Sequence, residues 1–204
     1  MRKKIQSWLF YRLLFHPAAV FEELSDLQPS PYSVFFRYLL WLAVLPPLFS
    51  YIGASRVGWH LGAAEPLFVL PKALLALNVA YFLALVTSFV TTAILSHWMA
   101  ATYGGRRGLG VHFAMVTIVA APIVAASMIH LYPHVFINVL ALIPALIWSM
   151  YLLYSGLPVV LRISPERGML MASSLIGWLL VAAVSLLGLT VVLWNSGIGR
   201  SIGV

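Results

Sequence analysis

The sequence predicts an all-α fold: a polytopic integral membrane helical bundle of five transmembrane helices, preceded by a short N-terminal interfacial amphipathic helix. Hydrophobic residues make up 62% of the 204 residues and charged residues only 8%, against roughly 25% in soluble domains. The apolar residues form runs of about 20 or more, the length of helix that crosses a hydrocarbon core about 30 Å thick. We expect an N-terminal cytoplasmic or interfacial segment (1–32), a five-helix transmembrane domain (33–196) and a short C-terminal tail (197–204).

The composition excludes several classes of function. The chain has no cysteine, so thiol catalysis, disulfides and iron–sulfur ligation are ruled out. Its formal net charge is +7, but the basic residues are scattered over short loops and the N-terminus, as membrane topology requires. We therefore expect no nucleic-acid partner and no cofactor.

The N-terminal segment mixes basic, apolar and acidic residues. Residues 1–4 are basic like the start of a signal peptide, but no long apolar core follows, and we expect the segment to be retained. Pro17 can begin a short helix with opposite apolar and acidic faces. The apolar face holds Val20, Phe21 and Leu24, and the acidic face holds Glu22, Glu23 and Asp26. Such a helix suits the membrane interface; the alternative is a plain cytoplasmic tail.

The first two spans are expected at residues 33–54 and 71–98. Pro46 and Pro47 lie inside the first, where proline removes a backbone donor and kinks or breaks a helix. The second span has a small residue at every fourth position: Ala76, Ala80, Ala84, Ser88, Thr92 and Ser96. Because small side chains let helices approach closely in lipid, we expect this helix to be central in the bundle. The alternative is that the small residues form a homodimer face.

The other spans are expected at residues 109–131, 135–158 and 169–194, and the fifth helix can begin within the loop at 162–167. The third span repeats the small-residue spacing in order to pack against its neighbours. These packing residues are Thr117, Ala121 and Ala125. Pro122 and Pro144 lie at mid-span and add two further expected helix breaks, at a depth similar to that of the first pair.

Lysine and arginine residues indicate the orientation. With a cytoplasmic N-terminus, nine of them fall on the cytoplasmic side and three on the other, which satisfies the positive-inside rule. The nine are Arg2, Lys3, Lys4, Arg12, Arg37, Arg106, Arg107, Arg162 and Arg167, and the three are Arg56, Lys72 and Arg200. Five spans then place the C-terminus outside.

Few side chains in the spans carry reactive chemistry. No ionisable residue lies near the middle of an expected span, which argues against an ion-coupled carboxylate site. His60, His130 and His134 would share the outer side and are the candidate metal ligands; simple polar capping is the alternative. Zinc-protease, nucleophile-elbow and paired-aspartate motifs are missing. We therefore expect no enzyme activity and no catalytic residue.

Two stretches late in the chain resemble the end of the Yip family domain, that of the Ypt/Rab-interacting integral membrane proteins. They are residues 151–158 (Tyr-Leu-Leu-Tyr-Ser-Gly-Leu-Pro) and 162–168 (Arg-Ile-Ser-Pro-Glu-Arg-Gly). Residues 43–47, 51–53 and 57–59, with the earlier His16 and Pro17, are similar to small bacterial inner-membrane members of that family. The resemblance covers residues 8–196. It implies five spans, a cytoplasmic N-terminus and a bacterial inner (plasma) membrane, and it brings no catalytic residues.

Two functional hypotheses follow. The leading one is a non-enzymatic membrane organiser or adaptor that binds membrane lipids or another membrane protein, with a homo-oligomer as a further possibility. The alternative is a small transporter, channel or lipid scramblase, in which proline-broken helices build a substrate cavity.

Overall fold

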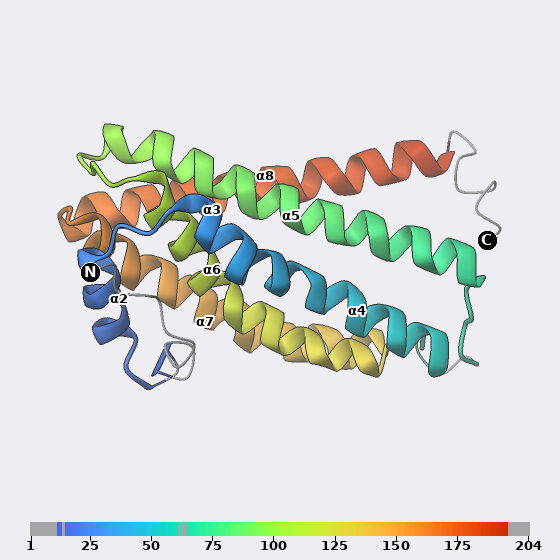
Figure 1. Cartoon of the computed structure of the whole chain (residues 1–204). Coiled ribbons are helices and arrows are strands. Elements are labelled where there is room, and N and C mark those ends of the chain that lie inside the picture. The colour runs from blue at the N-terminus through green and yellow to red at the C-terminus, as the bar shows by residue number, and fades with distance from the viewer. Residues whose placement is uncertain (1–11, 14, 61, 63–64, 196–204) are drawn as a thin grey trace.

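The computed structural model describes residues 12, 13, 15–60, 62 and 65–195. Long helices run along a common axis, and α2 lies across one end of them (Figure 1). The elements are α2 (Pro17–Asp26), α3 (Pro31–Val34), the π-helical η1 (Phe35–Leu39), α4 (Leu40–Arg56), α5 (Pro71–Thr102), α6 (Leu109–Ala126), the 3-10 helical η2 (Ser127–Leu131), α7 (Val135–Leu161) and α8 (Pro165–Asn195).

Five helical stretches are long and apolar enough to cross a membrane: Pro31–Arg56, Pro71–Ala100, Leu109–Leu131, Val135–Leu161 and Pro165–Ser185. The predicted membrane bundle of five spans is therefore confirmed. The helices continue a few residues beyond the predicted ends, since α4 reaches Arg56, α5 reaches Thr102 and α7 reaches Leu161. Proline begins α2, α3, α5 and α8, because its missing N–H falls where a helix has no acceptor to offer.

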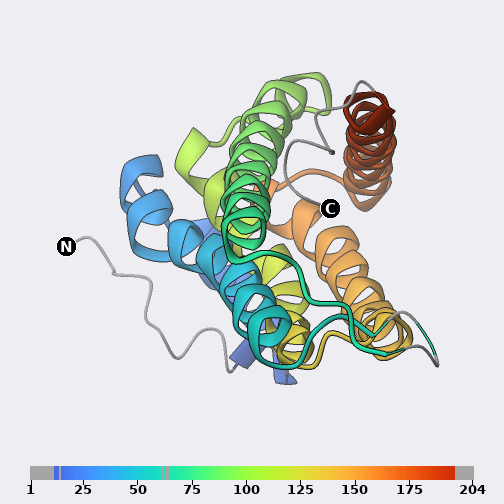
Figure 2. The same ribbon diagram turned by 90° about the vertical axis from the view of Figure 1, so that its right-hand side faces the viewer.

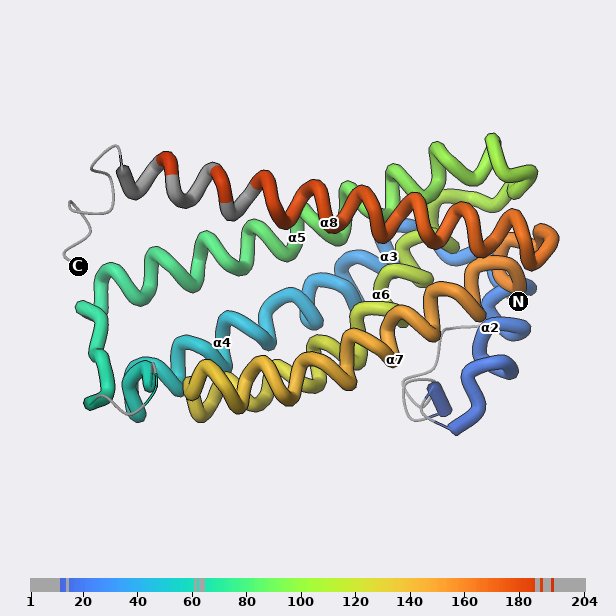
Figure 3. The backbone as a smooth tube through the Cα atoms, turned by 180° about the vertical axis from the view of Figure 1, so that it is seen from behind, coloured from blue at the N-terminus to red at the C-terminus, as the bar shows by residue number. Residues whose placement is uncertain are grey.

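The two ends of the bundle are built differently. One end, called the α2 end below, holds α2, the α5–α6 turn and the α7–α8 turn (Figure 1). The other end, called the loop end, holds the α4–α5 loop and the α6–α7 connection, and it faces the viewer in Figure 2. α7 and α8 meet at their turn and diverge toward the loop end (Figure 3).

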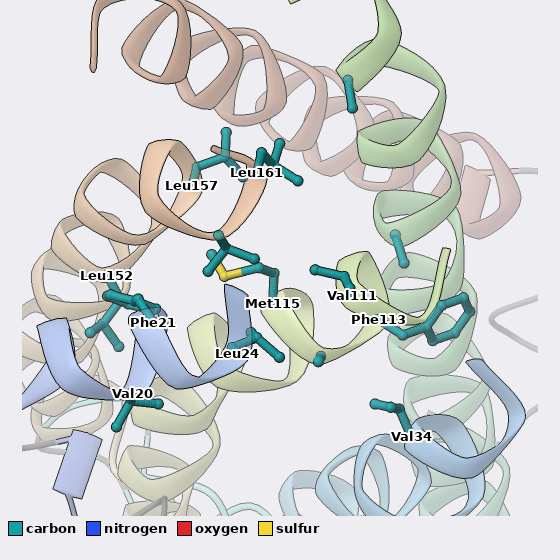
Figure 4. Close-up of a cluster of buried hydrophobic side chains, with 14 of the residues drawn as sticks. Val20, Phe21, Leu24, Val34, Val111, Phe113, Met115, Leu152, Leu157 and Leu161 are labelled. Carbon is teal, nitrogen blue, oxygen red and sulfur yellow. The ribbon is translucent and has the colours of Figure 1, made fainter. Parts of the chain in front are cut away.

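The main hydrophobic core lies toward the α2 end, where side chains of α2, α6 and α7 meet (Figure 4). Phe21 of α2 is only 1% exposed and lies beside Leu152 of α7 in Figure 4. Gly156 makes room for this ring, since a Cβ added to Gly156 would lie 2.5 Å from Phe21 Cε1. Leu24 and Met115 complete the contact between α2 and α6.

The apolar side chains expected on one face of α2 are buried in this core. Two ion pairs join charged residues of α2 to other parts of the chain: Arg162 Nη2 donates to Asp26 Oδ1, and Arg12 lies 3.5 Å from Glu23. The apolar face thus packs on protein. The position of α2 in the membrane interface stays a prediction.

Of the kink or break expected at each mid-span proline, the break is wrong, and the kink stays a prediction. α4 continues through Pro46 and Pro47, α6 through Pro122, and α7 through Pro144. Neighbouring helices can hold a membrane helix together at a proline even though one backbone hydrogen bond is lost. The departures from α-helical geometry lie elsewhere, in η1 before α4 and in η2 after α6.

The prediction that the second span is central is also wrong. In the apolar window of the α5 span 17% of residues are buried, against 50% for the α6 span, so α6 is the central helix. Ala76, Ala80 and Ala84 are exposed, and they do not pack inside the bundle. The physical reason is the divergence of the neighbours, because α8 no longer lies close to the other helices near the loop end (Figures 1 and 3).

Glycines mark the closest backbone approaches instead. A Cβ added to Gly53 on α4 would lie 2.1 Å from the carbonyl oxygen of His130, and one added to Gly110 on α6 would lie 1.8 Å from that of Pro29. Both distances are far shorter than a van der Waals contact, and the opposing atoms belong to the backbone. These positions therefore require glycine, as in other closely packed membrane helices.

Candidate functional site

A cavity of about 340 Å³ lies inside the bundle and is the candidate functional site. Its walls come from α4, α5, α6, η2, α7 and α8. The volume falls within the range of roughly 300–1,000 Å³ that is typical of ligand pockets. Pro46, expected to break α4, contributes to the wall, so this proline shapes the cavity without interrupting its helix.

The lining is apolar except for a few hydroxyl groups and one imidazole. The polar members are Tyr81, Ser88, Thr92, Ser96, Ser127 and His130. No aspartate, glutamate, lysine or arginine is among the described residues that line it. An ion would lose its hydration there without compensation. The chemistry of the lining therefore suits a neutral, largely apolar guest with an oxygen or hydroxyl group.

Tyr81, Ser88 and Thr92 lie on one face of α5, because they are seven and four residues apart. Within the described chain, none of the three side-chain hydroxyls forms a hydrogen bond, although all three line the cavity. Their free hydroxyls can therefore donate to, or accept from, an oxygen of a guest molecule. The sequence indicated Ser88 and Thr92 only as small packing residues, and it gave no reason to select Tyr81.

The cavity reaches a buried polar pair toward the α2 end. Ser96 Oγ lies 2.8 Å from His112 Nδ1, and the two residues belong to α5 and α6. His112 is 1% exposed, and its Nε2 atom is buried without a partner in the described chain. The His97 ring packs edge-on against it at 5.1 Å. Sequence analysis missed this pair; the available signal was that both residues lie close to the Gly-rich turn between two adjacent spans.

His130 lies near the loop end, where Asn138 organises the α6–α7 connection. His130 Nδ1 and Asn138 Oδ1 are hydrogen-bonded. The Asn138 Nδ2 group donates to the backbone oxygens of Tyr132, at 3.1 Å, and His134, at 2.8 Å. The three hydrogen bonds that this one amide group forms therefore hold the 3-10 helix and the start of α7 together beside the cavity.

The three histidines expected as metal ligands do not share a site. His60 and His134 come together, with stacked rings whose centroids are 6.2 Å apart, and the backbone of His60 pairs with Pro133 and Val135. His130 is held separately by Asn138. No group of three metal-binding side chains occurs among the described residues. The three candidates therefore do not form one three-histidine site, and the pair His60 and His134 ties the α4–α5 loop to α7.

The packing residues expected on α6 have mixed surroundings. Thr117 is buried, and its hydroxyl donates to the Phe113 carbonyl of its own helix at 2.8 Å. Ala121 is half-buried, whereas Ala125 is exposed and makes the expected packing wrong at that position. Small residues at every fourth position thus indicate one face of a helix, but they do not show how much of that face a neighbouring helix covers.

Comparison with known proteins adds a family and a relative. The family model described as the Yip1 domain matches residues 11–193. The chain is also 30% identical, over 161 residues, to the protein named "Inner membrane protein YohC" of Escherichia coli strain K12, and equally to that of strain O6:H1. Each alignment covers 79% of this chain and 83% of the relative. No solved structure matches the chain significantly.

Proposed function

The chain belongs to the Yip1 domain family, and on that premise we propose that it is a non-enzymatic organiser or adaptor of a bacterial inner membrane. In this proposal another membrane protein, a second copy of the chain or a lipid binds along the part of α5 that the bundle leaves uncovered. The relative's description as an inner membrane protein supports the compartment.

One observation carries the proposal. The small residues at every fourth position of α5 begin on an exposed surface and continue into the cavity. Ala76, Ala80 and Ala84 are exposed, and Ser88, Thr92 and Ser96 line the cavity. Small residues allow a second transmembrane helix to approach closely, and the packing of such helices is what drives association in lipid. A partner seated on the exposed part would therefore reach the mouth of a cavity that accepts neutral groups.

The test is native mass spectrometry of the protein extracted gently from its own membrane at its natural level. The wild type is expected to retain a stoichiometric second protein, a second copy or a lipid. The double variant Ala80→Leu with Ala84→Leu is expected to lose a protein partner, because the longer side chains prevent close approach. Ala101→Leu is the matched control, since Ala101 is exposed on the same helix at the α2 end.

A second arm separates lipid from protein. Ser88→Phe should fill part of the cavity and release a lipid held there, while a protein seated on Ala80 and Ala84 should remain. If the wild type carries no partner, or if every variant keeps the same partner at the same stoichiometry, the proposed surface is wrong.

A small transporter, channel or lipid scramblase is the second candidate. Its support is the cavity itself, which runs between Ser96 and His130 through the middle of the bundle. The uncharged lining favours a neutral or lipid cargo over an ion. Reconstituted vesicles test it: movement of a labelled phospholipid faster than in empty vesicles would favour this candidate, and equal rates would count against it.

The orientation forms part of the proposal. Arg106, Arg107, Arg162 and Arg167 lie at the α2 end, which we place in the cytoplasm together with the N-terminus. The chain has no cysteine, so single substitutions can be labelled without background. An impermeant maleimide applied to intact cells should label Glu65→Cys and leave Arg106→Cys unlabelled; the reverse pattern would invert the topology.

A further inference from the structure

Asn138 determines which nitrogen of the His130 ring carries a proton. The Asn138 Nδ2 group donates to two backbone oxygens, those of Tyr132 and His134, so the Oδ1 atom of the same amide can only accept. The hydrogen bond between Asn138 Oδ1 and His130 Nδ1 therefore requires a proton on Nδ1. In the neutral ring this leaves Nε2 without a proton, and Nε2 can then act only as an acceptor.

The Nε2 atom of His130 is available to a guest molecule. His130 lines the cavity near the loop end, and its Nε2 atom is accessible and forms no hydrogen bond with any residue that the structure describes. The hydroxyls of Tyr81, Ser88 and Thr92 can each donate or accept, so they take any oxygen of a guest. The His130 nitrogen is more selective, because it requires a guest that has a hydrogen-bond donor.

The donor that suits this nitrogen is an uncharged hydroxyl group. A buried ammonium group would need a carboxylate beside it, and no aspartate or glutamate is found in the described part of the cavity wall. Leucines of α7 and α8 form much of the remaining wall, and they are Leu153, Leu157, Leu175 and Leu179. If each non-hydrogen atom of a guest takes roughly the volume of a water molecule, about 30 Å³, the cavity of about 340 Å³ holds about eleven of them. One alkyl chain with a hydroxyl group at its end has this size.

The cavity is not sealed on the side of α8. Four consecutive residues of this helix, Trp178, Leu179, Leu180 and Val181, are each at least 36% exposed. Successive residues of an α-helix point about 100° apart, so these four cover every side of α8, and neighbouring helices do not enclose it at this level (Figure 3). Leu179 also lines the cavity and lies within the span Pro165–Ser185. The unsealed side therefore faces the hydrocarbon of the bilayer, and a guest enters from there.

We propose that the cavity binds a neutral lipid alcohol from the bilayer. The hydroxyl group of this lipid donates to His130 Nε2 near the loop end, and its alkyl chain packs against the leucines of α7 and α8. The part of a longer chain that the cavity does not hold leaves through the unsealed side. The inference names the guest of the cavity described above, and it rests on the proposal that the bundle binds a lipid.

Nitrogen NMR of isotope-labelled histidine rings tests the site in the wild-type protein, held in phosphatidylcholine nanodiscs. The His130 ring should carry its proton on Nδ1. Dodecanol is the probe, and it should shift the Nε2 signal until the site is saturated. Dodecyl methyl ether is the matched probe, because it has the same chain and an oxygen but no donor. It should bind roughly tenfold more weakly, since the nitrogen then loses water without gaining a hydrogen bond.

A pair of variants tests the residue. Radiolabelled dodecanol, counted above the amount that protein-free nanodiscs take up, measures the affinity. His130→Phe keeps a flat ring but removes the acceptor, and it should weaken binding roughly tenfold, to the level of the ether. His134→Phe is the matched control, since it makes the same change at the loop end in a residue outside the described cavity wall. It should change binding less than twofold.

Any of four results would overturn the proposal. These are a proton on His130 Nε2, equal binding of dodecanol and its methyl ether, equal binding by the two phenylalanine variants, or tighter binding of dodecyl phosphate than of dodecanol. If His130→Phe does not fold, the NMR spectrum of the wild type and the comparison of the two probes decide the matter. A wild type that retains a protein partner but does not prefer the alcohol refutes this inference alone. One that binds dodecanol at His130 but retains no protein partner refutes only the partner surface on α5.

Discussion

Small side chains occur in both halves of α5 but have opposite surroundings. Toward the loop end, Ala76, Ala80 and Ala84 are exposed, whereas toward the α2 end Ala93 and Ala100 are buried. The second half lies where α2, α6, α7 and the start of α8 converge on one core, and the first half lies where α8 has diverged (Figures 1 and 3).

This difference shows that small residues at regular spacing make close packing of a helix possible, but they do not show that a neighbouring helix is in contact with them. In lipid an uncovered alanine costs little, because the surrounding acyl chains are as apolar as a neighbouring helix. The packed half is therefore expected to respond to substitution by losing stability, and the open half by losing partners. The following variants test that division, from the largest expected effect to the smallest.

Gly110→Ala should cost the most. The new Cβ would lie 1.8 Å from the Pro29 carbonyl oxygen, so the backbone of α6 or of the segment before α3 must move, at a cost of roughly 3 kcal/mol or more. Gly177→Ala is the matched control, because a Cβ on this α8 residue meets nothing within 4 Å. It should stabilise by about 0.5–1 kcal/mol through the better helix propensity of alanine. Unfolding in detergent measures both, and similar values would break the comparison.

Ala93→Leu and Ala80→Leu compare the two halves of α5 directly. Ala93 is 0% exposed, and enlarging a buried side chain costs roughly 1–3 kcal/mol. Ala80→Leu should stay within about 0.5 kcal/mol of wild type, as exposed substitutions do. The free energy of unfolding in the same detergent is the measurement. A large loss in Ala80→Leu would show that the open half packs inside the bundle after all.

Ser96→Ala tests the polar pair between α5 and α6. It leaves the buried His112 Nδ1 without its partner, which should lower the free energy of unfolding by roughly 1–3 kcal/mol. We expect a value toward the lower end of this range, because alanine leaves room for a water molecule from the cavity. Thr91→Ala is the control, since that exposed hydroxyl bonds only to carbonyls of its own helix. Chemical unfolding should separate the two variants, and equal values would remove any special role for the pair.

Asp26→Asn should have the smallest effect. It breaks the ion pair with Arg162, in which both side chains are more than half exposed, and such pairs contribute only about 0.2–1 kcal/mol. The loss should shrink further as salt is raised, because exposed charges are screened. Unfolding curves at low and high salt measure this. A loss that does not change with salt would mean that the pair also orders the contact between α2 and α7.

Sequence patterns gave the spans and the start of most helices, and physical reasons explain why. A run of apolar residues has one favourable arrangement in a bilayer, and proline at a first helical position, as at Pro71 and Pro165, leaves little choice of where a helix begins. The expected breaks at Pro46 and Pro144 failed, because the packing of neighbours determines whether a proline interrupts a membrane helix.

The candidate site could be predicted only in part. Ser88 and Thr92 were selected for their spacing, but the cavity they line depends on how far α8 lies from α5, which no local pattern records. The contact between His60 and His134 likewise depends on backbone pairing across two distant loops. Tyr81 carries no signal in a single sequence, because its place in the cavity wall depends on how distant helices are arranged.

Because α8 diverges from its neighbours, it is held by the bundle mainly at one end. This helix has 31 residues and so is about 46 Å long. It is anchored near its first turns, where Met171, Ala172 and Leu175 are buried. The far end of the helix, Asn195, lies 20 residues beyond Leu175, or about 30 Å along the helix, so a rotation of about ten degrees around that anchor would carry it roughly 5 Å. Small adjustments of the first turns of α8 would therefore be amplified toward the loop end.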